Sequence, residues 1–504
     1  MTVKIILLVI FFASMISVGI YSRKHATNVN DFVLGGRSVG PWLTAFAYGT
    51  SYFSAVVFVG YAGQFGWKYG ISSTWIGLGN AFIGSLIAWV LMGRRTRVMT
   101  QHLHAATMPD FFGKRYNSNA LKIVASAIAF VFLIPYTASV YNGLSRLFGM
   151  AFDIDYSICV IAMAILTGVY VILGGYMATA INDFIQGIIM LVGIVVVIFS
   201  VLEGKGGFTE AVKSLAHVES DVQPGAFASF FGPDPVNLVG VVILTSLGTW
   251  GLPQMVQKFY AIKNEKAIKT GTIVSTAFAL IVAGGCYFLG GFARLFESDK
   301  IHNADGGVIY DAIVPSMLET LPDLLIGVVI VLVLSASMST LSSLVLTSSS
   351  TLTLDFLKGT VCKNMKDKTQ LFIMKVLIVF FITISVIIAL DPPTFIAQLM
   401  GISWGALAGA FLAPFLYGLY WKGVTKLAVW ASFITGVGIT VSNMFIGYIE
   451  SPINAGAIAM IAGLIVVPII SLITPKLNKD MLEKTFVCYD EKVEVTEKTS
   501  LKEI

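Results

Sequence analysis

Apolar segments long enough to cross a membrane follow one another along almost the whole chain. Of its 504 residues, 56% are hydrophobic and only 12% are charged, whereas a soluble globular protein carries roughly 25% charged residues. Because no polar domain separates the apolar segments, we expect a single transmembrane domain over residues 1–474. Residues 475–504 are polar and of mixed charge, and we expect them to form a solvated cytoplasmic tail.

A membrane-spanning helix needs about 20 mostly apolar residues, and this rule predicts about thirteen spans. They lie near 3–21, 42–63, 72–93, 119–148, 155–174, 181–202, 236–257, 270–292, 319–349, 371–390, 396–421, 425–447 and 454–474. We expect Met1–Tyr21 to be a retained first span. Its flanking charges, Lys4 before and Arg23 after the apolar run, do not match a cleaved signal peptide.

The positive charges divide unevenly between alternate connections. With the N-terminus outside, the cytoplasmic connections hold about three times as many Lys and Arg residues as the outer ones, as the positive-inside rule demands. The cytoplasmic group includes Arg37, Arg94, Arg95, Arg97, Lys114, Arg115, Lys258 and Lys263. Missing one span would invert every later connection. The pattern therefore favours an odd number of spans and a C-terminus in the cytoplasm.

Two spans contain residues that interrupt helices. The first, 42–63, carries Ala47-Tyr-Gly-Thr-Ser-Tyr-Phe-Ser54, with a glycine and several hydroxyl groups in mid-span. The second, 236–257, carries Thr245-Ser-Leu-Gly-Thr-Trp-Gly-Leu-Pro253, where two glycines and a proline disfavour a continuous helix. In lipid such breaks persist only where protein or a cavity satisfies the backbone. The freed carbonyls suit Na⁺, and half-helix N-termini suit a carboxylate.

The interrupted spans are the second and the seventh of the predicted set. If spans two to six and seven to eleven are two repeats, about 42–202 and 236–421, each break falls in the first helix of a repeat. The odd repeat length makes the two copies inverted across the membrane. Paired breaks in matching helices are typical of a transporter's binding site, although glycine and proline are also common in membrane helices generally.

Hydroxyl groups line one face of the span 319–349. Ser335, Ser339 and Ser342 recur at helical spacing, which predicts either tight packing of small residues or part of a binding site. Neither interrupted segment contains a carboxylate. Carbonyls and hydroxyls alone can hold Na⁺, whereas a carried proton needs a titratable group, so sodium coupling is favoured. Asp183, near one end of its span, is either a functional intramembrane acid or an interfacial cap.

The remaining polar residues exclude other classes of protein. A net charge of +5 is small for this length and does not indicate a nucleic-acid partner. The four cysteines and five histidines show no metal-site spacing. No group of His, Asp and Cys converges as an intramembrane active site would require, so we do not expect an enzyme. A proton-coupled carrier and a transporter-like sensor or channel stay open as alternatives.

Several motifs resemble the sodium:solute symporter family. They are Phe32-Val-Leu-Gly-Gly-Arg-Ser-Val-Gly-Pro41, Gly49-Thr-Ser-Tyr-Phe-Ser54, Gly174-Gly-Tyr-Met-Ala-Thr-Ala-Ile-Asn-Asp-Phe-Ile-Gln-Gly187 and Met338-Ser-Thr-Leu-Ser342. They occur in the family's order over most of the chain, which makes the resemblance specific. It implies a LeuT-like fold of five-plus-five inverted repeats with extra flanking helices.

The resemblance also implies the residues of the site. One Na⁺ would be held by the backbone carbonyls of Thr50, Phe53 and Ala336 and by the hydroxyls of Ser339 and Thr340. Asp183 would lie on the route by which the ion leaves toward the cytoplasm. The solute would contact Tyr52, Ser54, Tyr136, Thr249, Trp250 and Pro253.

Sequence differences between branches of the family predict which solute is carried. Where its proline transporters carry an aspartate, this chain has Tyr52. Leu247-Gly-Thr-Trp-Gly-Leu-Pro253 and Asp391-Pro-Pro393 are more similar to the pantothenate branch. We therefore expect sodium-coupled import of a small carboxylate-bearing solute, pantothenate or monocarboxylate-like, by alternating access. A sodium/proline or other amino-acid symporter is the alternative.

Overall fold

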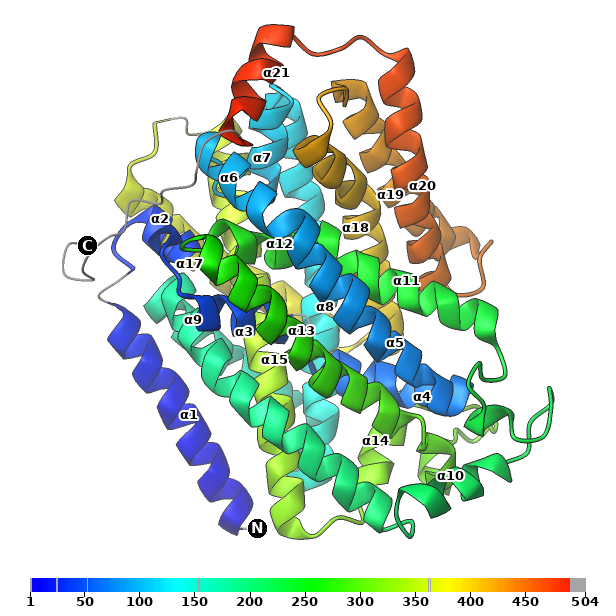
Figure 1. Cartoon of the computed structure of the whole chain (residues 1–504). Helices are drawn as coiled ribbons and strands as arrows, with labels where there is room; N and C mark the ends of the chain where they lie inside the picture. Colours follow the sequence, from blue (N-terminus) through cyan, green and yellow to red (C-terminus); the bar gives the residue numbers. More distant parts are fainter. Residues whose placement is uncertain are drawn as a thin grey trace.

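The structure is a bundle of helices joined by short connections (Figure 1). It is a computed structural model that describes residues 2–23, 26–51, 53–152, 155–360, 362 and 364–489. Within these ranges the extended backbone pairs at isolated bridges only, Val39 with Ile262 and His302 with Val308. The predicted all-α class is confirmed.

The main helices are α1 (Thr2–Ser22), α3 (Pro41–Ser51), α8 (Asn119–Phe152), α9 (Tyr156–Glu203), α11 (Pro235–Gly251), α12 (Pro253–Tyr260), α13 (Glu265–Gly290), α15 (Asp323–Thr351), α17 (Asp367–Leu390), α18 (Ile396–Tyr420), α19 (Lys426–Ile446) and α20 (Pro452–Ile473). Shorter helices are α2 (Val29–Leu34), α4 (Ala62–Tyr69), α5 (Thr74–Gly79), α6 (Arg94–His102), α7 (Met108–Arg115), α10 (Phe208–Ala216), α14 (Tyr310–Leu318), α16 (Lys358–Thr360) and α21 (Lys479–Phe486). Wider π-helical turns at Val56–Tyr61, Asn80–Ile87, Trp89–Gly93 and Leu352–Leu357 continue several of them.

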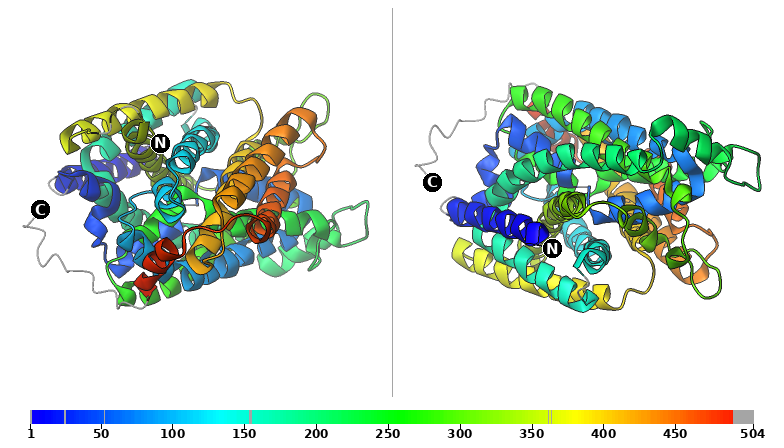
Figure 2. Two further views of the ribbon diagram at one scale, coloured as in Figure 1. Left: turned by 90° about the horizontal axis from the view of Figure 1, so that it is seen from above. Right: turned by 90° about the horizontal axis from the view of Figure 1, so that it is seen from below.

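Two helices form the centre of the bundle and others its edge. In the most apolar stretches of α15 and α18, 78% and 89% of the residues are buried, against 28% in α17 and 22% in α1. Views along the bundle show α1 and α17 at its margin and α19 beside α20 on another side (Figure 2). Because lipid is as apolar as the interior, the outer faces of these helices keep their large aliphatic side chains. The hydroxyl-rich span 319–349 therefore lies at the centre.

Among the described residues, ten helical stretches are long and apolar enough to cross a membrane, and a bent pair raises the number to eleven. Two of the ten, Val56–His102 and Tyr156–Glu203, have 47 and 48 residues, about twice what one crossing needs. Each is interrupted by a glycine with positive φ, Gly70 at 62° and Gly175 at 56°. The predicted number of thirteen spans requires counting both stretches twice, and it stays a prediction.

Part of the segment after α20 docks on the bundle, while Lys479, Asp480, Glu483 and Lys484 in it are exposed. Tyr489 donates its hydroxyl to the carbonyl of Leu419 at 2.8 Å, and its ring centre lies 4.5 Å from the Arg95 guanidinium carbon. The Phe486 ring lies 4.8 Å from the guanidinium carbon of Arg115. Burial raises the pKa of the Tyr489 hydroxyl, which keeps it a neutral donor. These cation–π contacts hold a segment that looks merely polar in sequence.

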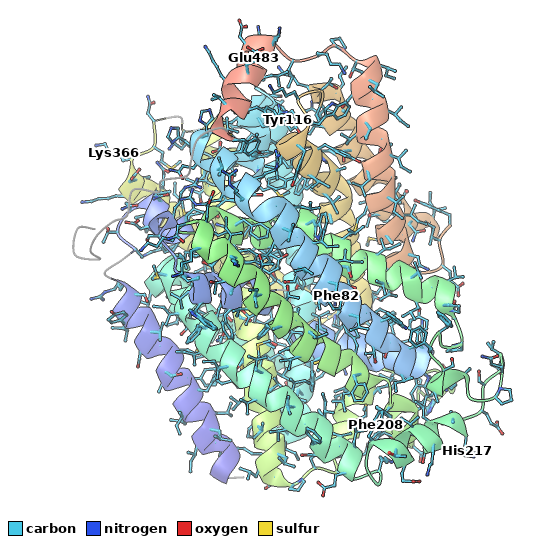
Figure 3. All side chains as sticks on the ribbon, in the orientation of Figure 1. Phe82, Tyr116, Phe208, His217, Lys366 and Glu483 are labelled. Carbon is cyan, nitrogen blue, oxygen red and sulfur yellow. The ribbon has the colours of Figure 1, made fainter. Side chains whose placement is uncertain are left out.

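The two ends of the bundle carry different segments. Glu483 of α21 and Lys366 lie at one end, together with Tyr116, and His217 after α10 lies at the other (Figure 3). Residues 490–504, the rest of the predicted tail, lie outside the described residues.

Three positive residues that we assigned to solvated connections are buried instead. Arg97, Arg115 and Lys258 expose 2%, 0% and 2% of their surfaces. Arg115 donates to the carbonyl of Gly418 at 2.9 Å, and Arg97 donates to the carbonyl of Ile262. Buried cations need such partners. These two arginines therefore connect neighbouring helix ends through hydrogen bonds.

Candidate ion and solute site

The first predicted break lies at the end of α3. That helix ends at Ser51, Phe53 and Ser54 are not helical, and helix resumes at Ala55. The last carbonyls of a helix have no partner within it. The carbonyl of Thr50 accepts the Phe53 N–H at 3.3 Å and keeps a second lone pair, and the carbonyl of Phe53 lies beyond the end of α3, so both are able to contact other groups. Tyr52, predicted to contact the solute, lies outside the described residues.

The second predicted break separates α11 from α12. Leu252 between them is extended (φ −83°, ψ 122°), and the two helices differ in direction by 46°. Pro253 begins α12 and has no N–H with which to continue the bonding of α11. Both breaks occur within the segments where the sequence predicted them.

The five residues predicted to hold sodium meet between α3 and α15. Ser339 donates its hydroxyl to the carbonyl of Thr50 at 3.1 Å and to that of Ala336 at 2.9 Å. The Thr340 hydroxyl lies 3.0 Å from the carbonyl oxygen of Phe53, 3.1 Å from that of Ala336 and 3.5 Å from that of Thr50. All five residues are fully or almost fully buried.

This cluster is a small shell of neutral oxygens. Its three carbonyls and two hydroxyls come from two helices, and one of these helices is broken at the cluster. Oxygen ligands of this kind suit a hard cation. In a dry interior they replace part of its hydration shell, so the arrangement is able to hold a small monovalent ion.

Asp183 lies in the interior of α9 and is completely buried. It therefore does not cap a helix end at a solvent-exposed interface. One of its carboxylate oxygens, Oδ2, lies 3.6 Å from the Lys258 ammonium of α12. The predicted exit residue and a lysine that we had assigned to a loop thus form a buried pair.

An aromatic cluster lies near the predicted solute residues Tyr136 and Ser54. The Tyr136 ring meets the Trp404 ring of α18 edge-on, with centroids 5.8 Å apart. Among the described residues, the hydroxyls of Tyr136 and Tyr61 and the indole N–H of Trp404 are buried and make no hydrogen bond of standard geometry, although the Tyr136 hydroxyl lies beside Trp404 and Ser54. A buried donor without a partner costs about 1–3 kcal/mol. These donors could serve a ligand that accepts hydrogen bonds.

The other predicted solute residues use their donors within the protein. Thr249 donates to the carbonyl of Gly84 at 3.0 Å, and the Trp250 indole donates to that of Ile83 at 3.1 Å. Both carbonyls belong to the π-helical stretch Asn80–Ile87, where wider turns free the backbone. Pro253 is buried at the start of α12.

Three residues near the site had no signal of their own in the sequence. Tyr61 and Trp404 belong to the aromatic cluster, and Gln254, next to the predicted break, has both amide atoms buried without a partner. Gly248 of α11 allows Trp404 to approach, because a Cβ there would lie 2.7 Å from the indole ring. The neighbourhood of the second break could have suggested Gln254, but nothing in its span distinguished Trp404.

A cavity of about 1350 Å³ opens at the end of the bundle where α4 ends and α11 begins. Its polar lining includes Gln64, Lys68, Asn237, Arg294, Gln398 and Glu450. Gln64 belongs to α4, the helix that continues from the first break. The sodium and solute candidates that the structure describes do not line this cavity.

The sequence matches known transporters along nearly its whole length. The family model described as "Sodium:solute symporter family" matches residues 32–436. The osmoregulated proline transporter OpuE of Bacillus subtilis is 30% identical over 477 residues, covering 92% of this chain and 95% of that protein. A sodium/proline symporter of Staphylococcus aureus is 31% identical over 491 residues, covering 94% and 92%.

Two solved structures share the fold. A substrate-bound, outward-open Na⁺-coupled sialic acid symporter superposes with a TM-score of 0.77 at 17% identity, covering 94% of this chain and 98% of that one. Mhp1, a transporter of the nucleobase-cation-symport-1 family, superposes with a TM-score of 0.53 at 12% identity, covering 90% and 97%. The predicted LeuT-like arrangement is confirmed by these likenesses.

Proposed function

Because the chain belongs to the sodium:solute symporter family, we propose that it imports proline or a closely related zwitterionic amino acid together with Na⁺, by alternating access. As a member of this family it is a multi-pass membrane transporter and not an enzyme, and Na⁺ is its coupling ion. The observation that carries the proposed mechanism is the meeting of the broken helix α3 with Ser339 and Thr340.

The relatives favour proline over the solute that the motifs suggested. Two relatives of known substrate that cover more than nine tenths of this chain are a proline transporter and a sodium/proline symporter. The expectation of pantothenate or a monocarboxylate has no support among them, whereas the amino-acid alternative does. The buried donors of Tyr61, Tyr136 and Trp404 fit this proposal, since a solute carboxylate accepts hydrogen bonds from hydroxyl and indole groups.

A zwitterionic solute also matches what one Na⁺ can drive. One charge moved through about 100 mV contributes about 2.3 kcal/mol, and a tenfold Na⁺ gradient adds about 1.4 kcal/mol. Together they concentrate a solute without net charge roughly 500-fold. A monoanion that travels with one Na⁺ moves no net charge and gains only about tenfold. One coupling ion therefore suffices for an amino acid.

We place the N-terminus outside and the C-terminus in the cytoplasm of a cell membrane, with the repeats at about 42–202 and 236–421. In this orientation the large cavity faces outward and α21 lies at the cytoplasmic face. Arg95 and Arg115 lie beside α21, which agrees with the positive-inside rule. A reporter enzyme that works only outside the cytoplasm can be fused after residue 489. Activity of this fusion protein would contradict the orientation.

Uptake by purified protein in liposomes tests the function. Liposomes loaded with K⁺ and given an inward Na⁺ gradient should accumulate labelled proline and ²²Na together, and should not accumulate pantothenate or lactate. Accumulation of pantothenate or lactate instead of proline would overturn the proposed solute. Uptake that persists without Na⁺ and follows a pH gradient would show proton coupling, and a current without accumulation would show a channel.

Replacing Trp404 by phenylalanine should weaken solute binding and leave Na⁺ binding unchanged. A phenyl ring replaces the indole, so the side chain stays aromatic and the N–H is lost; a hydrogen bond to a charged group contributes about 1.5–3 kcal/mol. The proline concentration for half-maximal uptake should therefore rise about 10- to 100-fold. Trp430→Phe in α19, where the ring packs on Phe433, is the matched control. Equal proline dependence in both variants would remove Trp404 from the solute site.

A further inference from the structure

A charged pair lies in the interior of the bundle, beside the candidate sodium site. Lys258 of α12 and Asp183 of α9 expose 3% and 0% of their side chains. The ammonium lies 3.6 Å from the carboxylate oxygen Oδ2 and 5.1 Å from the centre of the Tyr176 ring. Burying two opposite charges is costly unless both are well paired and hydrogen-bonded. Their retention at this place therefore calls for a functional explanation.

Two hydroxyl groups link this pair to the end of α3, next to the sodium candidates. Lys258 donates to the Ser343 hydroxyl at 3.0 Å, and the Ser343 and Ser51 hydroxyls share a hydrogen bond of 3.0 Å. Ser51 directly follows Thr50, and Ser343 lies one helical turn beyond Ser339 on α15. An ion that leaves the five-oxygen cluster along these hydroxyls arrives at Lys258 and Asp183.

The carboxylate is only loosely engaged by its partner. Within the described part of the chain neither oxygen of Asp183 accepts a hydrogen bond of standard geometry, and the Lys258 ammonium, at 3.6 Å, lies farther from it than in an ordinary ammonium–carboxylate hydrogen bond. The ammonium lies closer to the Ser343 hydroxyl, at 3.0 Å, than to Asp183. A bare carboxylate in such a dry place would bind a partly dehydrated Na⁺ tightly and hold it. A positive charge already beside it lowers that attraction.

We infer that Lys258 is a tethered competitor of the transported ion: its ammonium occupies the place beside Asp183 and Ser343, so that Na⁺ passes the carboxylate without being trapped there. This inference rests on the proposed sodium symport. It makes Lys258 a positioning residue, which acts on the ion through Asp183.

Replacing Lys258 by methionine tests the inference. The side-chain volume is largely kept and the charge is lost, so Asp183 becomes free to retain Na⁺. We expect the Na⁺ concentration for half-maximal proline uptake to fall at least tenfold and the maximal rate to fall at least tenfold. Lys258→Arg, which keeps the charge, should restore both values to within about threefold of the unchanged protein. A K258M protein whose half-saturating Na⁺ concentration is unchanged or higher would overturn the inference.

A second comparison uses a double variant in which both buried charges are removed, so that neither is left unpaired. In Asp183→Asn the ammonium is unopposed near the ion site, and half-maximal uptake should need several times more Na⁺. Adding K258M to D183N should return the Na⁺ dependence to that of the unchanged protein. Equal Na⁺ dependence in D183N and in the double variant would overturn the inference. Absence of Na⁺-dependent uptake by the unchanged protein would instead overturn the proposed function.

Discussion

Replacing Thr340 by valine is expected to abolish most sodium-driven uptake at ordinary Na⁺ concentrations. The Thr340 hydroxyl contacts the carbonyls of Phe53, Ala336 and Thr50, so it joins both halves of the proposed ion shell. Valine keeps the shape and removes this oxygen. Loss of one polar contact to a charged ligand costs about 1.5–3 kcal/mol, which corresponds to a 10- to 100-fold rise in the Na⁺ concentration for half-maximal uptake.

Two further variants separate an effect on the ion from an effect on packing. Thr340→Ser keeps the hydroxyl and should stay within a fewfold of the unchanged protein. Ser349→Ala in the same helix loses a hydroxyl that donates within its own helix, to Leu346, and it should leave the Na⁺ dependence unchanged. The measurement is the initial rate of proline uptake at a series of Na⁺ concentrations. If Thr340→Val and Ser349→Ala give the same Na⁺ curve, the cluster is not the ion site.

Ser339→Ala should also raise the Na⁺ concentration for half-maximal uptake, but by less than Thr340→Val. Its hydroxyl contacts two of the three carbonyls, those of Thr50 and Ala336, and it does not contact Phe53. We therefore expect a roughly tenfold rise in the half-saturating Na⁺ concentration. An effect larger than that of Thr340→Val would place the ion nearer to the Ser339 hydroxyl than to the Thr340 hydroxyl.

The helix breaks and the ion cluster could be predicted because they depend on local residue types. Glycine and proline change what the backbone does wherever they occur, so a break is visible in one segment alone. The motif around Ser339 then supplied the partner of the first break. The structure adds that the oxygens of Thr50 and Thr340 lie within 3.5 Å, which no spacing in the sequence could show.

Lys258 and Trp404 could not be predicted because burial inside a membrane bundle leaves little trace in the sequence. In a soluble protein the polar face of a helix identifies its outer side. Here the faces toward lipid and toward the core are both apolar, so nothing showed that Trp404 points inward. Lys258 lies close to Lys263 in the chain, and charge counting treated both as loop residues. Only the contact with Asp183 distinguishes Lys258.

The segment 479–489 shows that docking of a polar segment is also hard to predict from the sequence. Residues 479–489 have the composition of a solvated terminus, yet Phe486 and Tyr489 lie against Arg115 and Arg95. Each pairing joins residues several hundred positions apart. A few aromatic side chains are enough to dock a segment when their partners are already in place.

Replacing Gly66 by alanine should prevent the protein from folding. Gly66 lies in α4, which continues from the first break, and a Cβ there would lie 1.8 Å from the carbonyl oxygen and 2.1 Å from the carbonyl carbon of Gly290 in α13. Both atoms belong to the backbone, so no side-chain rotation relieves the overlap. The helices must separate, which costs more than the roughly 1–3 kcal/mol of ordinary overpacking, out of a total stability of about 5–15 kcal/mol.

Gly438→Ala in α19 is the matched control for this contact, because a Cβ at that position meets no atom within 4 Å. Size-exclusion chromatography in mild detergent should give a single peak for Gly438→Ala and aggregate for Gly66→Ala. The melting temperature of any folded Gly66→Ala protein should be far below that of the control. If the two variants are equally monodisperse and melt together, α4 and α13 do not approach as closely as in this structure.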